Sequence, residues 1–419
     1  MTEPPRPIAV LVDREGLGDV MLKLPFLRAL RRAFPDHPVW WIATHQTSMA
    51  DDLRPLFRND VAEVLPYAGL DGPAGPLLAR LRALPPFERV FDSRTKISTV
   101  ALARFALRHR GFYACLPGYF LCDGRPPSRA RPRHIAARML SLVAAATGRP
   151  PDAAGRLEAS PAARALAERL LPSGPTYVGV APGSRQADKN WPMARYAEAA
   201  AALARKGVTP VIFLGPQEAE VAADFASAAP GAVIVRADPA ITAAEGLDRL
   251  IAQAQRLSAL LANDNGVGHL MGAAGTPVVS LFGPTDPARW APVAPANLIL
   301  CARDFGGGTA MEAIPVGPVV EAVMQLLART GPARRSGPAG HEVVDVGGAG
   351  DGDRDLLFAD LDLAAGDGVV VSQDPDLVAR PGVQGDHRAA AHPQQLLHGQ
   401  DRAAQHDGDL DVDGIDLAH

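Results

Sequence analysis

Residues 1–330 alternate short apolar runs with longer amphipathic stretches. Continuous apolar runs such as Ile8–Val12 and Val39–Ala43 are typical of buried strands. Between them, Asp19–Ala33 repeats apolar residues every three or four positions and carries arginines on the other side, which predicts a helix. Strands that alternate with helices need crossover connections, so the pattern predicts parallel sheets and the α/β class.

The alternation restarts after Gly148–Gly155, whose Pro and Gly residues are typical of a linker. Further strands are expected at Arg89–Asp92, Tyr177–Ala181, Val211–Leu214, Val233–Val235, Ala259–Ala262 and Val278–Phe282, and helices at His134–Thr147, Met193–Arg205, Glu218–Ala226 and Val316–Arg329. We therefore expect two tandem α/β domains, residues 1–165 and 166–330, and a separate tail, residues 331–419.

The tail loses the regular apolar periodicity and is dominated by Asp, Gly, Ala and His. Such a composition buries too little apolar surface to offset chain entropy, so we expect disorder that the catalytic unit does not need. The alternatives are an out-of-frame extension, an acidic interaction segment and a His-rich metal-binding tract. That tract would consist of His387, His392, His398 and His406.

Overall charge and cysteine usage limit the choice of partner and compartment. The formal net charge is −4, so no basic balance indicates nucleic acid as a partner. The three cysteines form neither a CxxC pair nor a metal-ligand spacing and fit a reducing compartment. With no signal-peptide pattern and no apolar run of about 18 residues, we expect a cytoplasmic protein, at most peripheral to a membrane.

The first motif, Arg14–Asp19, directly follows the first expected strand and contains Gly16 and Gly18. Glycines at the end of a strand let the backbone approach a ligand closely, and the next helix begins with exposed N–H groups. A carboxylate at this edge of a parallel sheet is well placed to act as a general base, which makes Asp19 the candidate. The alternative is a helix N-cap aspartate, and spacing alone does not separate the two.

The second motif is Ala181–Ser184, followed by Lys189–Pro192, again after a strand. Ser184 and Lys189 can hold a phosphate, the serine as a donor and the lysine as a point charge. A lysine in a loop is usually a solvated surface group, but this chain has only four lysines among its many arginines. We expect Trp191 to pack inside the protein rather than to stack on a ligand.

The third motif, Asn263–His269, places a Gly-rich turn between a strand and a helix of small residues. A diphosphate can rest on the N-terminus of such a helix, and His269 can donate to it, although a single histidine is more often structural. The turn is not a dinucleotide fingerprint, because Met271 stands where the third glycine would be required.

Together the three segments resemble glycosyltransferase family 9, the ADP-heptose:lipopolysaccharide heptosyltransferases. Arg14–Arg31 is similar to the family's R-x-x-x-LGD and LPxLRALR segment, Pro182–Trp191 to pGS…K-x-W, and Asn263–Trp290 to NDSGxxHLAAAxGxPxxxLFGPTxPxxW. The resemblance covers about residues 7–330. It implies a GT-B fold, with two Rossmann-like domains facing across a cleft. In that arrangement the N-terminal domain binds the acceptor and the C-terminal domain the donor.

The resemblance also implies a role for individual residues. Asp19 would be the general base, Ser184 and Lys189 would contact the donor phosphates, Glu218 the nucleotide ribose, Asp264 the transferred sugar, and Gly266 and His269 the diphosphate, with Gly18 and Asn265 completing the donor site. The family usually has Ser or Thr at the position of Asn265. Asparagine can still donate a hydrogen bond there, but it is bulkier.

These residues predict an inverting transferase that needs neither a metal nor a cofactor. Lys189, Ser184 and the helix start near Gly266 would stabilise the departing diphosphate. DxD-like strings, such as Asp351–Asp353, occur only in the tail, so no metal site is expected. The expected partners are an ADP-heptose-like donor, a glycan or glycolipid acceptor and the cytoplasmic face of the inner membrane. The alternatives are a non-catalytic nucleotide-sugar-binding protein and a sugar epimerase of GT-B shape.

Overall fold

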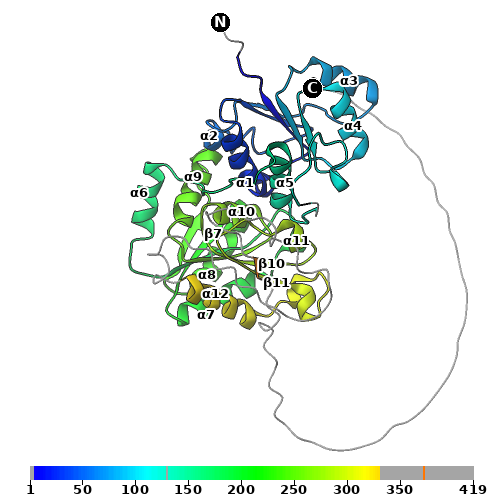
Figure 1. The fold of residues 1–419 in the computed structure, drawn as a ribbon. Coiled ribbons are helices and arrows are strands. Elements are labelled where there is room, and N and C mark those ends of the chain that lie inside the picture. The colour runs from blue at the N-terminus through cyan, green and yellow to red at the C-terminus, as the bar shows by residue number, and fades with distance from the viewer. Residues whose placement is uncertain (1–3, 129–130, 331–370, 373–419) are drawn as a thin grey trace, which may run out of the picture. The chain divides into compact units, whose positions relative to one another are not determined.

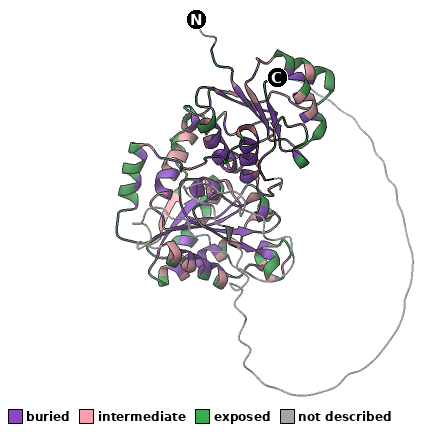
Figure 2. Cartoon of the chain, in the orientation of Figure 1, coloured by how far each residue is buried: buried purple, intermediate pink, exposed green. Residues whose placement is uncertain are grey.

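The computed structural model describes residues 4–128, 131–330 and 371–372. These residues form two parallel sheets with helices on both faces, which confirms the expected α/β class (Figure 1). Buried residues concentrate in the strands and in the helix faces that lie against them (Figure 2). Among the described helices, none is both long enough and apolar enough to cross a membrane.

The first sheet has the strand order β3-β2-β1-β4-β5, with every neighbouring pair parallel. Its strands are β1 (Ile8–Val12), β2 (Val39–Ala43), β3 (Glu63–Leu65), β4 (Arg89–Asp92) and β5 (Phe112–Ala114). Its helices are α1 (Leu17–Ala33), α2 (Arg54–Phe57), α3 (Ala74–Ala83), α4 (Ile97–Ala106) and α5 (Ile135–Thr147). The central strand β1 is buried along its whole length, as its uninterrupted apolar run predicts.

Alternate side chains of β1 enter two different cores, because successive residues of a strand point to opposite faces. Val10 and Val12 join residues of α1 and α5. Ala9 and Leu11 join residues of α3 and α4 on the other face. The α3–α4 layer and the α1–α5 layer therefore cover opposite sides of the first sheet.

The described residues of the second half form a seven-stranded parallel sheet with the order β12-β11-β10-β9-β6-β7-β8. Its strands are β6 (Tyr177–Ala181), β7 (Thr209–Leu214), β8 (Val233–Arg236), β9 (Ala259–Asn263), β10 (Val278–Phe282), β11 (Asn297–Cys301) and β12 (Val371–Ser372). Its main helices are α6 (Pro161–Leu170), α7 (Met193–Arg205), α8 (Ala222–Ala228), α9 (Ala243–Ala254), α10 (Gly266–Ala273), α11 (Pro287–Trp290) and α12 (Val316–Thr330).

The edge strand β12 comes from within the expected tail and pairs with Asn297 and Leu298 of β11. Residues 331–370 and 373–419 lie outside the described residues, together with the DxD-like strings and the four tail histidines. Disorder of these residues stays a prediction.

Two sequence expectations need revision. The expected helix Glu218–Ala226 is instead a 3-10 helix, Pro216–Val221, followed by α8, because Pro216 and Gly215 begin a tight turn directly after β7. The expected boundary at residues 165/166 falls inside α6, which packs against α9 of the second half. We therefore propose that the boundary lies before α6, in the loop of residues 148–160.

Candidate functional site

Asp19 lies in the first turn of α1, beyond the carboxyl end of β1. Gly16, not Asp19, is the N-cap residue, which corrects the N-cap alternative. Asp19 stands three residues later, and its Oδ2 accepts a hydrogen bond of 2.9 Å from the Gly16 N–H. The carboxylate thus helps to begin the helix and is held at the edge of the first sheet.

A buried ion pair lies behind Asp19, and sequence reasoning did not find it. Lys23, one helical turn after Asp19, donates from Nζ to Glu15 Oε1 at 2.6 Å. Glu15 Oε2 also accepts hydrogen bonds from Trp41 and Thr47. Burial alone would lower the pKa of Lys23, but the charges of Glu15 and Asp19 outweigh it and raise that pKa. Lys23 therefore stays positively charged next to Asp19. The sequence held one indication of this pair: Lys23 lies on the apolar face of the predicted helix, where a lysine needs a buried partner.

The loop after β6 carries Ser184 and Lys189. It begins with Gly183 in the left-handed region (φ +87°), and the Ser184 hydroxyl accepts a hydrogen bond from the Gln186 N–H. Trp191 at its end is fully buried and packs edge-on against Tyr196, which confirms that it packs inside the protein. Asn263 Oδ1 accepts hydrogen bonds from the Trp191 N–H and the Tyr196 hydroxyl, so this loop is fixed to the end of β9.

Asp264 connects the second motif to the third. Its Oδ2 accepts hydrogen bonds from Lys189 Nζ at 2.9 Å and from Thr285 Oγ1 at 2.8 Å, and its Oδ1 lies 3.3 Å from His269 Nε2. Burial opposes ionisation, but His269 and Lys189 outweigh it and lower the pKa of Asp264 to about 2. Lys189 is largely buried and paired, so it is not a solvated surface lysine. Thr285 lies in the Asn263–Trp290 segment, but the sequence did not predict its hydrogen bond to Asp264.

Asn265 joins the start of α10 to the loop after β6. It is the N-cap of α10: its Oδ1 accepts from the Gly268 N–H at 2.7 Å. Its Nδ2 donates to the carbonyls of Ala181 and Gly183 at 3.1 and 2.8 Å. Both amide hydrogens are therefore used inside the protein, and a contact of Asn265 with the donor stays a prediction. A serine or threonine hydroxyl, with one hydrogen, could not hold both carbonyls.

The two halves meet where α1 and α10 begin. A Cβ atom on Gly18 would lie 2.9 Å from His269 Cδ2, and one on Gly266 would lie 3.2 Å from Leu17 Cβ. A methyl group at position 18 would have to displace the His269 ring, and one at position 266 would crowd Leu17. His269 Nδ1 is buried and has no hydrogen-bond partner among the described residues.

Arg185, from the loop after β6, also reaches the start of α1. A Cβ atom on Gly16 would lie 2.8 Å from Arg185 Nη2 and 3.6 Å from Asp19 Oδ2. The guanidinium and the Asp19 carboxylate therefore both lie close to Gly16. Sequence reasoning quoted the neighbouring serine and lysine but missed this arginine.

Glu218 lies in the turn after β7. Its Oε2 would be 2.7 Å from a Cβ atom on Gly215, and its Oε1 lies against Gly183. Its carboxylate therefore lies at the carboxyl ends of β6 and β7, next to the Ser184 loop. Within the described residues, no group of three or more His, Cys, Asp or Glu is arranged to hold a metal ion.

The two parallel-sheet α/β domains have the GT-B architecture of nucleotide-sugar-dependent glycosyltransferases. The family profile of glycosyltransferase family 9 (heptosyltransferase) matches residues 86–311, and the chain belongs to this family. No curated protein sequence matches the chain in a direct comparison.

Solved structures of this type share the fold. A family 9 glycosyl transferase from Veillonella parvula is 20% identical, with 78% of this chain and 99% of that chain covered and a TM-score of 0.56. ADP-heptose lps heptosyltransferase II from E. coli is 18% identical, with 77% and 98% covered and a TM-score of 0.53. An E. coli heptosyltransferase with ADP is 18% identical, with 76% and 99% covered and a TM-score of 0.51.

Proposed function

We propose that this glycosyltransferase moves a heptose from an ADP-heptose-like donor to a hydroxyl of a lipopolysaccharide-type or other glycan acceptor. The proposal includes inversion of the anomeric centre, no need for a metal ion, and work at the cytoplasmic face of the inner membrane. One observation carries it. Asp19 directly follows Gly18 in α1, and Gly18 lies against His269, a member of the Lys189–Asp264–His269 cluster. The E. coli neighbours named for ADP-heptose and ADP support the choice of donor.

Asp19 removes the proton from the acceptor hydroxyl. The oxygen attacks the anomeric carbon from the face opposite the diphosphate, a new carbon–oxygen bond forms, and the bond to the leaving phosphate oxygen breaks. The diphosphate leaves with the electron pair, and Asp19 holds the proton. Such a base contributes about 10²–10⁴-fold in rate. Lys23, buried one turn away, has a raised pKa and keeps its positive charge behind Asp19.

The charge that develops on the leaving diphosphate needs donors already in place. Lys189, the Ser184 hydroxyl and the N–H groups at the start of α10 supply them. In the structure Lys189 is bound to Asp264. A bound diphosphate would replace Asp264 as the ion-pair partner of Lys189. Asp264 would then accept a hydrogen bond from a sugar hydroxyl. Glu218, beside Gly215, would accept hydrogen bonds from the ribose hydroxyls.

A panel of nucleotide sugars tests the choice of donor. A ligand that binds only the folded state raises the free energy of unfolding by RT ln(1 + [L]/Kd), about 2.7 kcal/mol at a hundredfold excess over Kd. We expect ADP-linked heptoses to raise the melting temperature most, and turnover to require a glycan acceptor. A larger shift with another base or sugar would contradict the proposed donor, and sugar release that never needs an acceptor would contradict transfer.

A further inference from the structure

Exposed large hydrophobic side chains concentrate in one part of the first half, and two of them lie on α4. Six large hydrophobic side chains are exposed among the described residues, and four of them belong to residues 67–120. Ile97 and Phe105, on α4, are 57% and 78% exposed. Phe120, at the turn after β5, is 59% exposed. The fourth is Tyr67, in the loop after β3.

Ile97 and Phe105 lie on the same side of α4, because they are eight residues, or about two turns, apart. They are separated by about 12 Å along the axis, with the partly exposed Ala101 between them. The opposite side of the helix, with Val100 and Ala103, is buried against the first sheet. α4 is therefore apolar on both sides, which is typical of a helix that lies against a second surface.

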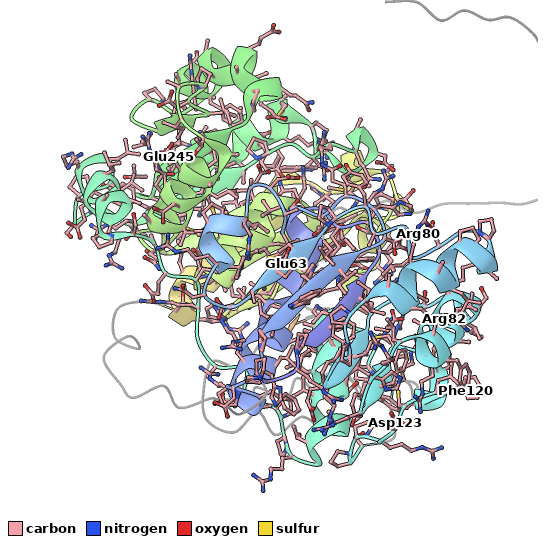
Figure 3. All side chains as sticks on the ribbon, turned by 90° about the horizontal axis from the view of Figure 1, so that it is seen from above. Glu63, Arg80, Arg82, Phe120, Asp123 and Glu245 are labelled. Carbon is pink, nitrogen blue, oxygen red and sulfur yellow. The ribbon has the colours of Figure 1, made fainter. Side chains whose placement is uncertain are left out.

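The same layer carries only positive charge. Neither α3 nor α4 contains Asp or Glu, and residues 66–125 contain nine Lys and Arg against four Asp and Glu. The four carboxylates are paired within the protein: Asp71 with His45, Glu88 with Arg89 and Arg110, Asp92 with Arg94, and Asp123 with Arg104. Within the part of the chain that the structure describes, Arg80 donates to a neutral carbonyl, that of Gly69, and forms no ion pair. Arg80, Arg82 and Phe120 lie along one outer side of the first half (Figure 3).

We propose that the α3–α4 layer, with Ile97, Phe105, Phe120, Arg80 and Arg82, is a docking surface for an anionic lipid bilayer. Apolar side chains among arginines fit the boundary between acyl chains and negatively charged headgroups. A second copy of the chain fits less well, because a symmetric dimer through this layer would bring two positive surfaces together. The inference rests on the proposed function, in which a glycolipid acceptor brings the enzyme to the membrane.

Vesicle flotation of the full chain, without donor or acceptor, tests this surface. We expect binding to phosphatidylcholine vesicles that contain phosphatidylglycerol, loss of binding at high salt, and weak binding to phosphatidylcholine alone. Each arginine near an anionic surface contributes roughly fivefold in affinity. Arg80→Glu with Arg82→Glu should therefore weaken binding by at least roughly twentyfold, and Ile97→Ser with Phe105→Ser should weaken it on every lipid mixture.

Matched pairs elsewhere provide the controls. Leu166→Ser with Leu170→Ser removes two exposed leucines of α6, and Arg205→Glu with Lys206→Glu reverses two exposed charges at the end of α7. Both should leave vesicle binding unchanged, and all variants should keep the melting temperature.

Equal effects of the test and control pairs, or no preference for phosphatidylglycerol, would overturn the proposal. Analytical ultracentrifugation provides a further test. A dimer that the double variant Ile97→Ser with Phe105→Ser dissociates would also overturn the proposal, because the layer would then bind a second copy of the chain. The readout needs no nucleotide sugar, so failed flotation leaves the proposed reaction standing. Normal flotation without sugar transfer contradicts the reaction alone.

Discussion

The imidazole ring of His269 lies against the backbone of Gly18, so closely that a Cβ atom at position 18 would come within 2.9 Å of the ring. This contact joins the first turn of α1 (Leu17–Ala33) to that of α10 (Gly266–Ala273). It brings the proposed base, Asp19, next to the helix N-terminus proposed to hold the diphosphate. We therefore expect a side chain at position 18 to disturb the proposed site.

Gly18→Ala should lower kcat and weaken donor binding together. The His269 ring is also beside Asp264, so the added methyl group must displace the ring or separate the two helices. Gly317→Ala in α12 is the control, because nothing lies within 4 Å of a Cβ atom there. Enzyme kinetics and calorimetry measure both effects. Native kinetics for Gly18→Ala would show that the contact is not needed.

Lys189→Ala should weaken binding of both the donor and the nucleoside diphosphate product by roughly 1.5–3 kcal/mol, because a charge-assisted contact is lost. Lys206→Ala removes an exposed lysine after α7 and should leave both affinities unchanged. Calorimetric titration of the two variants decides this. If Lys189→Ala weakens the sugar nucleotide but not the diphosphate product, the lysine acts through Asp264 rather than on phosphate.

The free energy of unfolding should fall as the pH drops from 6.5 to 4, with His134 as one cause. Burial lowers the pKa of His134 from 6.5 to about 4. In this window the unfolded chain binds a proton that the folded chain does not, so acid favours unfolding, by up to roughly 3 kcal/mol.

His134 caps α5 and contacts the Ala291 carbonyl across the two halves. His134→Asn keeps a cap but removes the titration. Urea unfolding should show lower stability at neutral pH and a shallower decline toward pH 4. An equally steep decline would assign the effect to other groups.

Transfer should continue in EDTA. In the proposed mechanism, Lys189 and the α10 N-terminus at Gly266 would supply the positive charge that a divalent ion supplies in other sites. Turnover with and without chelator is the measurement. Loss of activity in EDTA, with recovery on adding Mg²⁺ or Mn²⁺, would contradict this mechanism.

Much of the fold could be read from local pattern. The apolar run Ile8–Val12 and the amphipathic stretch Met193–Arg205 have the predicted bounds, because burial there follows sequence periodicity directly. The short strands β3 (Glu63–Leu65) and β5 (Phe112–Ala114) were missed, since three residues give too little periodicity. The proposed domain boundary before α6 rests on the packing of α6 on α9, which no local pattern reveals.

The sequence predicted which residues make up the candidate site, but not which of them bind one another. The motifs named Lys189, Asp264 and His269, and the structure joins them through hydrogen bonds and ion pairs. The direction of the Asn265 amide, toward Ala181 and Gly183, depends on a loop that is distant in sequence. The Glu15–Lys23 pair was missed for a related reason. An ion pair inside the protein can be recognised only when the positions of both side chains are known.

The central claim is that Asp19 is the base of a sugar transfer, and Asp19→Asn tests it most directly. An asparagine oxygen can still accept the hydrogen bond from Gly16, so the start of α1 should be kept. Asp36→Asn, in the exposed turn after the same helix, is the control. Single-turnover transfer and donor affinity are measured on both variants. We predict that Asp19→Asn cuts turnover by about two orders of magnitude or more with donor affinity nearly unchanged, while Asp36→Asn behaves as the native chain. Near-native turnover of Asp19→Asn would contradict the account and leave Asp19 with the helix-capping role alone.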